Sequence, residues 1–396
     1  MNVLSLFDGM SCGQQALERA GIEVNQYFAS EIDKYAIQVT MANYPNTIQL
    51  GSVVNVDGYA LPKIDLLIGG SPCQSFSFAG KRKGMATTDE QEILTLEHYL
   101  QLKAEGYEFE GQSYLFWEFM RLLYEVKPKY FLLENVEMGE KWEGVLTQAI
   151  GVHALHINSA LVSAQNRKRI YFTNIGMESA GLFGYPVSII EKPKDKKILL
   201  KDILESEVDE KYFLSERMIN SFEIKTDKYK QLGGGFAFKP SEGESKSRTL
   251  TNPAKNRMDE TYIKEASQLI VHNTMPRSST TGKGVTGHLS RNDGKTYCLD
   301  TGNTNAVEIK AIMLGRSESW GMPENGGGKS YTLCKEQPHG IKYNNSRIRR
   351  LTPIECERLQ TVKDNYTNYV SDSQRYKMLG NGWTIEVISH IFKYIL

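Results

Sequence analysis

The chain has 396 residues, enough for two modest domains or for one domain with a large insertion. Its 40% hydrophobic and 24% charged residues are ordinary for a globular protein, and the strand-like start over Val3–Phe7 is too short for a signal sequence or a membrane span. The five cysteines are scattered and never spaced as CxxC, which argues against a disulfide framework or a zinc site and favours the reducing cytoplasm.

Basic and acidic residues balance at 47 each, but they are unevenly distributed along the chain. Between Gly181 and Arg350 there are 28 basic residues against 21 acidic ones, so the remainder carries a matching acidic excess. Such a basic segment is compatible with a face that meets phosphates. Solvated basic faces are also common, so the charge alone identifies no partner.

The amino-terminal residues predict the first half of a nucleotide-binding βαβ unit. Val3–Phe7 has the composition of a strand, residues 8–13 that of a glycine-containing turn, and residues 14–21 that of a helix. A second strand over residues 26–30 ends at Glu31, about 20 residues after the turn, where such folds hold ribose hydroxyls. Alternatively, this carboxylate stabilises the start of the next helix.

A cysteine follows the buried strand that we expect over Ile64–Ile68. Gly69 and Gly70 allow a sharp turn, and Pro72 then holds Cys73 at the carboxyl end of a strand, where open α/β sheets bind ligands. We therefore interpret Cys73 as a nucleophile. The alternative is a small buried hydrophobic residue, as most free cysteines are.

Two later strands are expected to deliver charged side chains. The strand over residues 129–133 is followed by Glu134, which should emerge beside Cys73 in a sheet of this kind. Alternation along the strand near residue 170 places Arg167 and Arg169 on one face, where two guanidinium groups could clamp a phosphate or a base edge.

The alternation of strand-like and helix-like segments stops at about residue 181 and returns after Arg350. Between these positions glycines and hydroxyl-bearing residues are more frequent, and we expect short polar strands. Afterwards Thr352 and Pro353 predict the start of a helix, and a glycine-rich turn over residues 378–384 precedes a final helix. We expect a catalytic and cofactor-binding domain over 1–184, an inserted domain over 185–345, and a return to the first domain over 346–396.

Taken in order, these pieces resemble the DNA cytosine-5 methyltransferase family. The motifs that carry the resemblance are Phe7-Asp8-Gly9, Glu31, Ser71-Pro72-Cys73-Gln74, Glu134-Asn135-Val136, Gln165-x-Arg167-x-Arg169, Arg350 to Gln360, and Gly380-Asn381. The first motif and the Gly-Asn-Gly-Trp-Thr run are most like the phage and animal de novo branches. Since no extra amino-terminal domain precedes the first strand, we expect a bacterial or phage enzyme.

The resemblance implies a fold and a reaction. The fold is a Rossmann-like α/β sheet of S-adenosylmethionine-dependent methyltransferases, with an inserted, mostly β target-recognition domain. In the reaction, Cys73 as thiolate adds to C6 of cytosine, C5 takes the methyl group, and S-adenosylhomocysteine is the other product. Glu134 would hold the base, and Arg169 is a candidate for the positive charge that lowers the pKa of a thiol from about 8.5. The residues expected to be catalytic are Cys73, Glu134, Arg167 and Arg169.

The resemblance also implies a cofactor site. Phe7 would stack on the adenine, and Glu31 would accept hydrogen bonds from the ribose. The residues expected to bind the cofactor are Phe7, Asp8, Gly9, Met10, Ser11, Cys12, Glu31, Ile32, Ser52, Val53, Asn381, Gly382 and Trp383. Many family members have Gly-Asp where this chain has Gly51-Ser52, so Ser52 or a backbone carbonyl would replace the usual carboxylate contact to the adenine amino group.

Double-stranded DNA is the partner that the resemblance implies. Its target base must be flipped out of the duplex at a cost of a few kcal/mol, with the loop from Gln74 to Gly84 closing over it. The residues expected to bind DNA are Gln74, Ser75, Ser77, Lys81, Arg82 and Lys83. We expect a cytoplasmic monomer with no metal and no membrane contact, for which a cognate restriction endonuclease remains an open possibility.

Three alternatives compete with this interpretation. A tRNA cytosine-5 methyltransferase shares the motifs, but the Cys-Phe-Thr signature of that branch is missing. A non-catalytic DNA-binding regulator would usually have lost the Pro-Cys or Glu-Asn-Val residues, which are present here. A flavin or nicotinamide oxidoreductase would explain the first turn and Glu31 but would leave Cys73 and Glu134 without a role.

Overall fold

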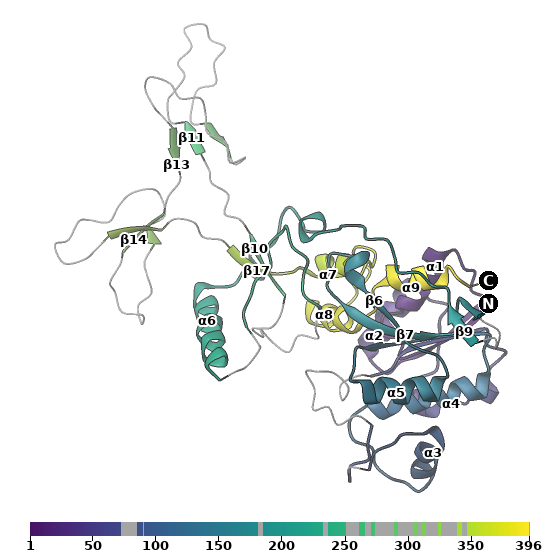
Figure 1. Cartoon of the computed structure of the whole chain (residues 1–396). Coiled ribbons are helices and arrows are strands. Elements are labelled where there is room, and N and C mark those ends of the chain that lie inside the picture. The colour runs from purple at the N-terminus through teal and green to yellow at the C-terminus, as the bar shows by residue number, and fades with distance from the viewer. Residues whose placement is uncertain are drawn as a thin grey trace. The chain divides into compact units, whose positions relative to one another are not determined.

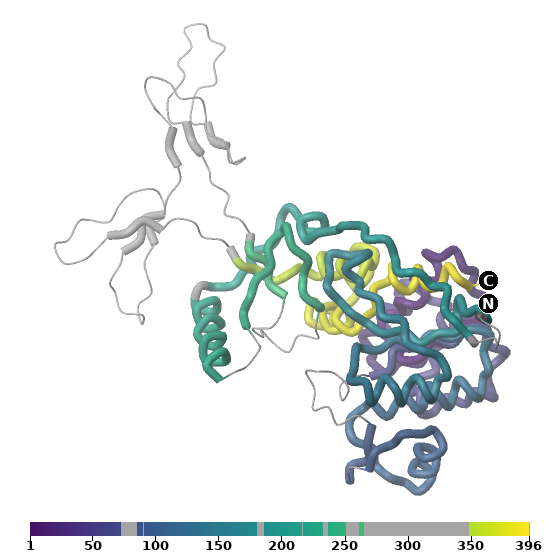
Figure 2. Tube along the Cα trace, in the orientation of Figure 1, coloured from purple at the N-terminus to yellow at the C-terminus, as the bar shows by residue number. Residues whose placement is uncertain are grey.

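The computed structural model describes most of the chain. The described residues are 1–72, 85–89, 91–180, 185–232, 237–250, 261–265, 271–273, 289–291, 305–307, 310–313, 324–325, 339–342 and 347–395. They form two compact units, one of Met1–Ile263 with Arg350–Leu396 and the other of Lys264–Arg349. Figure 2 follows the first unit from its purple amino terminus to its yellow carboxyl terminus. The three-part division expected at residues 184 and 345 stays a prediction.

A seven-stranded sheet in the order β3-β2-β1-β4-β5-β7-β6 is the framework of the first unit. Its strands are β1 (Asn2–Leu6), β2 (Gln26–Ser30), β3 (Ile48–Gln49), β4 (Leu66–Gly70), β5 (Tyr130–Val136), β6 (Leu155–Asn158) and β7 (Lys168–Thr173). The first five are parallel, and β7 runs antiparallel to both of its neighbours. The predicted Rossmann-like α/β class is therefore confirmed, and the carboxyl ends of the first five strands meet at one edge.

Helices cover both faces of this sheet (Figure 1). The helices around it are α1 (Cys12–Ala20), α2 (Lys34–Asn43), α4 (Phe116–Val126), α5 (Glu140–Ile150), α7 (Pro353–Leu359), α8 (Asp372–Asn381) and α9 (Ile385–Phe392), and α3 (Leu96–Ala104) packs against α4 rather than on the sheet. Helices α4 and α5 lie on one face, and α1 and α9 lie on the other (Figure 1). Of the helices in the described ranges, none is both long and apolar enough to span a bilayer.

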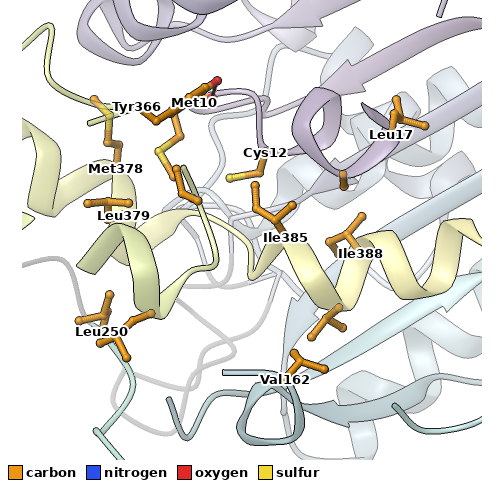
Figure 3. Close-up of a cluster of buried hydrophobic side chains, with 14 of the residues drawn as sticks. Met10, Cys12, Leu17, Val162, Leu250, Tyr366, Met378, Leu379, Ile385 and Ile388 are labelled. Atoms are coloured by element: carbon orange, nitrogen blue, oxygen red, sulfur yellow. Dashed lines mark hydrogen bonds between the residues drawn. The ribbon is translucent and has the colours of Figure 1, made fainter. Parts of the chain in front are cut away.

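Each face of the sheet has its own hydrophobic core. On the face of α1 and α9, Leu17, Ile385 and Ile388 are buried in one cluster with Met10 and Cys12 of the first turn (Figure 3). On the face of α4 and α5, Phe119, Trp142 and Leu146 belong to a second cluster. Burial of each such side chain contributes about 1.5 to 3 kcal/mol. Because α9 comes from the carboxyl terminus, the first core joins both ends of the chain.

Local signals fix several helix ends. Gly21 has φ +75° and ends α1, and its N–H donates to the carbonyl of Glu18. Thr352 and Glu355 form a capping box at the start of α7, with Pro353 in the first turn, as the sequence predicts.

The expected turn over residues 378–384 is wrong in its first half. Helix α8 continues to Asn381, so the turn is confined to Gly382–Thr384. A glycine at position 380 is tolerated in the last helical turn because Arg167 and Gln360 donate to carbonyls there, including those of Gly380 and Leu379.

The described residues in and next to the expected insertion (185–345) are not only β. They contain the hairpin β8 (Met177–Ala180) and β9 (Tyr185–Ser188), the short helices η5 (Leu200–Asp202) and η6 (Glu210–Tyr212), the pair β10 (Tyr262–Glu265) and β17 (Arg347–Arg350), and helix α6 (Glu216–Gln231). Where we expected short polar strands, α6 has 16 residues. The Ser215 side chain caps it, and Phe222 and Thr226, four residues apart, are buried on one face.

The second unit consists of short antiparallel strands in its described residues. One sheet has the order β12-β11-β13, with β11 (Val271–Asn273), β12 (Leu289–Arg291) and β13 (Asn305–Val307). The other has the order β15-β14-β16, with β14 (Lys310–Met313), β15 (Glu324–Asn325) and β16 (His339–Lys342). These strands agree with the short strands that the sequence predicts for this region.

Candidate active site

A cavity of about 730 Å³ opens where the carboxyl ends of β1, β2, β4 and β5 meet. Its walls come from residues 7–10, 12, 30–33, 36, 51–54, 70–72, 111–112, 114–115, 134–136, 377–378 and 380–383, together with Arg167 and Arg169. Such an edge of an α/β sheet is the usual place for a ligand. Of the predicted cofactor residues all but Ser11 line this cavity; Ser11 is buried beneath the turn and accepts a hydrogen bond from Gln14.

The turn after β1 has an unusual backbone. Phe7, Gly9 and Ser11 all have φ between +57° and +61°, in the left-handed region. For Phe7 and Ser11 this conformation is strained, and such strain persists only where the surroundings impose it. The turn brings the Phe7 ring and the Met10 side chain to the cavity wall.

Glu31 is held by backbone amides on both of its oxygens. Its Oε2 accepts from the N–H of Gly9 at 2.7 Å, and its Oε1 accepts from Ile32 at 2.7 Å and Asp33 at 2.8 Å. A carboxylate has about four acceptor positions, so one remains for a donor in the cavity. Both roles considered for Glu31 are compatible with this geometry, since it binds amides at the start of α2 and still faces the cavity.

A buried carboxyl group lies under the same turn. Asp8 Oδ1 accepts from the Tyr27 hydroxyl at 2.8 Å, while Oδ2 is buried and finds no partner among the described residues. Burial raises the pKa of Asp8 to about 6, although hydrogen bonds from Ser5, Tyr27 and Ser11 oppose the rise. Burial also raises the pKa of the Cys12 thiol to about 12, so this cavity-lining cysteine is not a nucleophile at neutral pH.

Residues 377–378 and 380–383, which come from the carboxyl-terminal part of the chain, form the other side of the cavity; we call them the return wall. At Gly382 a Cβ would lie 2.9 Å from Met10 Cε and 3.0 Å from the Met378 carbonyl, so a larger residue would have to displace the Met10 side chain and crowd the end of α8. Arg167 is buried and donates to the carbonyls of Gly382 at 2.9 Å and Gly380 at 3.2 Å. It also donates to the Leu250 carbonyl at 3.4 Å, which lies outside this wall.

Glu134 and Arg169 form an ion pair at the far end of the cavity. Arg169 Nε lies 2.9 Å from Glu134 Oε1, and the two side chains are only 14% and 12% exposed. In the sheet, Glu134 stands directly opposite Gly70, three residues before Cys73. The neighbouring Asn135 donates to the Ser71 hydroxyl at 3.0 Å, which ties the end of β5 to the segment that leads into Cys73.

Cys73 itself and the predicted DNA-binding residues lie outside the described residues. These are Gln74, Ser75, Ser77, Lys81, Arg82 and Lys83. Within the described residues, no group of three or more His, Cys, Asp or Glu side chains could hold a metal ion.

The sequence analysis missed several cavity residues. Tyr114 and Leu115 directly precede α4, in a stretch for which the sequence analysis named no functional residue. Lys377 reaches Asp33 Oδ2 at 2.6 Å across the cavity mouth, although 344 residues separate them in the chain. The Tyr-Leu-Phe run at the start of an amphipathic helix could have indicated the first pair, but no local pattern predicts the second.

A family model for C-5 cytosine-specific DNA methylases matches residues 1–141 and 152–396. Among curated relatives, the orphan methyltransferase M.SPRI of Bacillus phage SPR is 29% identical over all of this chain and 97% of its own length. The type II methyltransferase M1.ScrFI of Lactococcus lactis subsp. cremoris is 25% identical over 94% of this chain and 72% of its own.

Two solved structures share the fold. The Entamoeba histolytica methyltransferase EhMeth aligns with a TM-score of 0.57 at 15% identity, covering 100% of this chain and 97% of its own. A Spodoptera frugiperda DNMT2 mutant aligns with a TM-score of 0.55 at 18% identity, covering 99% and 98%. Because the family model matches nearly the whole chain, this protein belongs to the C-5 cytosine-specific DNA methylase family and is a DNA cytosine-5 methyltransferase.

Proposed function

We propose that this enzyme methylates C5 of a cytosine in a specific duplex DNA sequence, by base flipping and covalent addition of Cys73. One observation carries the proposal: a single cavity joins the Glu31 carboxylate at one end to the Glu134–Arg169 ion pair at the other. A methyl transfer between two bound molecules needs such a continuous space, because the reacting atoms must meet in one geometry.

The residues of the first end fit S-adenosylmethionine, which supplies a sulfonium methyl group when bound. Glu31 keeps an acceptor position for a ribose hydroxyl, and the Phe7 ring offers a face for the adenine. The close approach of Gly382 to Met10 makes this wall tightly packed. Met10, Asn381 and Trp383 would line the methionine end.

The second end fits a flipped cytosine. The Glu134 carboxyl group would bind N3 and the exocyclic amino group, and would stabilise the charge that develops on the base as the thiolate adds. Arg169, which holds Glu134, fixes the orientation of that carboxyl group. Arg167, which we expected to be catalytic, would serve by holding the wall at Gly380–Gly382.

The covalent step is assigned to Cys73. Its thiolate adds to C6 of the base, C5 becomes nucleophilic and takes the methyl group, and loss of the C5 proton with release of the thiolate gives 5-methylcytosine. Of the cysteines described, Cys12 is the one that lines the cavity, and its raised pKa makes it a poor substitute. The basic residues after Cys73 would bind the phosphate backbone on either side of the target.

The proposal extends to the oligomeric state, location and partners of the enzyme. We infer a cytoplasmic monomer that acts on double-stranded DNA. Its relatives are named both as orphan and as type II methyltransferases, so both a stand-alone enzyme and one paired with a restriction endonuclease fit the comparisons.

The decisive experiment is methylation of a random-sequence duplex library with S-adenosylmethionine, read by base-resolution mapping of 5-methylcytosine. Methylation in one short sequence context that disappears in Cys73→Ala is the expected result. If the DNA stays unmodified while a tRNA pool accepts methyl groups, the substrate is tRNA rather than DNA. Tight DNA binding without transfer to either nucleic acid would favour a non-catalytic regulator. Cys12→Ala is the matched control and should retain transfer.

A further inference from the structure

The wall of the cavity over residues 51–54 has little support from the sheet. Strand β3 ends at Gln49, and Gly51 then turns with φ +73°. Two hydrogen bonds to β2 fix the amino-terminal side of the wall. The N–H of Leu50 donates to the Ala29 carbonyl, and the Ser30 hydroxyl donates to the Gly51 carbonyl, each at 2.8 Å. The residues after Gly51 need support from another element.

That support comes from α4, on the other side of the wall. Arg121 Nη2 donates to the Val53 carbonyl at 3.1 Å. A few residues on, the N–H of Gly58 in η2 (Gly58–Ala60) donates to Glu125 Oε2 at 2.9 Å. A Cβ at Gly58 would lie 2.7 Å from the Cβ of Glu125, so the segment lies tightly against the helix.

Arg121 is itself held rigidly. Its Nε donates to Glu118 Oε2 at 2.7 Å, and its Nη1 lies 2.8 Å from both oxygens of Glu125. Glu118 is fully buried and also accepts from the Tyr99 hydroxyl and from Lys103 Nζ, each at 2.5 Å. A buried carboxylate with this many partners is fixed in place, so the guanidinium group that it holds is fixed as well.

The same wall includes the position where this chain departs from many family members. Ser52 stands where a carboxylate often contacts the adenine amino group, and its side chain makes no capping hydrogen bond at the start of η1 (Val53–Asn55). A neutral hydroxyl or a backbone group recognises an amino group more weakly than a carboxylate does. Its contribution depends on accurate placement of the backbone, which Arg121 controls at the next residue.

We propose that Arg121 is a positioning residue of the cofactor site, which holds the Val53 carbonyl and so keeps residues 51–54 in the conformation that receives the adenine end of S-adenosylmethionine. The inference rests on the cofactor assignment under the proposed function. Arg121 does not itself touch the cofactor, and its removal should weaken binding without changing the chemical step.

The test compares Arg121→Met with Arg19→Met. Arg19 makes matched contacts outside the cavity, to Glu386 and to the Thr361 carbonyl, both at 2.9 Å. Calorimetry with S-adenosylhomocysteine, in the absence of DNA, should give a Kd about 10-fold higher for Arg121→Met, the lower end of the effect of removing an outer partner from a binding site. The Kd for Arg19→Met should stay within about twofold of wild type by the same reasoning.

Two further measurements separate positioning from a purely structural role. The KM for S-adenosylmethionine should rise in Arg121→Met while kcat at saturation stays within about threefold. Wild type should prefer S-adenosylhomocysteine over its hypoxanthine analogue, and the preference should shrink in the variant. If Arg121→Met does not fold, Arg121→Lys should raise the Kd by about threefold, because an ammonium group cannot serve all three partners.

Other outcomes overturn the inference. A lower melting temperature for Arg121→Met or Arg121→Lys with an unchanged Kd would make the residue merely structural. A fall in kcat with unchanged KM, or a raised Kd with an unchanged preference for adenine, would place the effect elsewhere in the cavity. If wild type binds neither S-adenosylmethionine nor S-adenosylhomocysteine, the cofactor assignment itself fails.

Discussion

Arg169 Nε and Glu134 Oε1 lie 2.9 Å apart, at the end of the cavity that Gly70 also lines. The two residues come from antiparallel strands, β7 and β5, in which Val136 rather than Glu134 pairs with Arg169. The ion pair is therefore diagonal, and each side chain points to the cavity while the other fixes its orientation. With Arg169 committed to Glu134, its most direct effect is on the group that would bind the base.

Glu134→Gln should lower kcat by about 10²- to 10³-fold, as loss of a preorganised group that stabilises developing charge usually does. The amide keeps the size of the side chain but lacks the acid–base capacity that the carboxyl group offers at N3 while charge develops on the base. Steady-state transfer of labelled methyl groups measures the effect. The control is Glu137→Gln, a more exposed carboxylate three residues on that does not line the cavity. Wild-type kcat in Glu134→Gln would contradict the assigned role.

Arg167→Met should act mainly on stability and on the return wall. Removing a buried guanidinium group takes its donor from the Gly380 carbonyl and leaves the Gly382 carbonyl with Gln360 as its remaining side-chain donor, which should lower the free energy of unfolding by about 2 to 4 kcal/mol. Urea unfolding of Arg167→Met and Arg169→Met distinguishes the two arginines, since Arg169→Met should lose kcat instead. An Arg167→Met variant with wild-type stability and a large loss of kcat would return Arg167 to a catalytic role.

Asp8 should make stability depend on pH. Burial raises its pKa from 3.8 to about 6, so the folded protein binds this proton more tightly than the unfolded chain does. The corresponding stabilisation is complete below pH 3.8 and is lost as the pH rises through 6. Between pH 4 and pH 7.5, the free energy of unfolding of wild type should fall by about 2 kcal/mol relative to Asp8→Asn. Urea unfolding of both proteins across this range tests it, and parallel curves would refute it.

Much of the candidate site could be predicted because it depends on local order along the chain. In a parallel sheet the carboxyl ends of strands meet at one edge, so an acidic residue after a buried strand falls in the site. Glu31 follows this rule, whereas β5 continues past the expected end at residue 133 to Val136, so Glu134 lies within the strand; both carboxylates line the cavity. The cap at Thr352 and the stop at Gly21 were predictable for the same reason, since each depends only on a few neighbouring residues.

The rest depends on contacts between distant segments. Alternation correctly brings Arg167 and Arg169 to one cavity, but it does not say that the first donates to the return wall and the second to Glu134. The Lys377–Asp33 contact joins residues from the two ends of the chain. Likewise, the length of α8 depends on partners for its last carbonyls, which come from Arg167 and Gln360.

Gly70→Ala should disturb both ends of the cavity while leaving the sheet folded. A Cβ at this position would lie 2.8 Å from Trp383 Nε1 and 3.2 Å from Glu134 Oε2, so the indole and the carboxylate must move apart to admit it. These atoms belong to side chains that can shift, and the protein should therefore fold. We expect kcat/KM to fall by about 10²-fold, because displacement by a fraction of an ångström at both ends disturbs the geometry of transfer.

Two other glycines provide the controls for this variant. Gly144 in α5 has nothing within 4 Å of a Cβ, so Gly144→Ala should keep full activity and gain a little stability. Gly69→Ala would approach the Leu6 carbonyl and the Phe119 ring, each at 3.1 Å, so it should lower stability more than Gly70→Ala does. If Gly70→Ala melts below Gly69→Ala yet keeps wild-type kcat/KM, the residue supports the sheet, and the close packing of Trp383 and Glu134 around it has no part in catalysis.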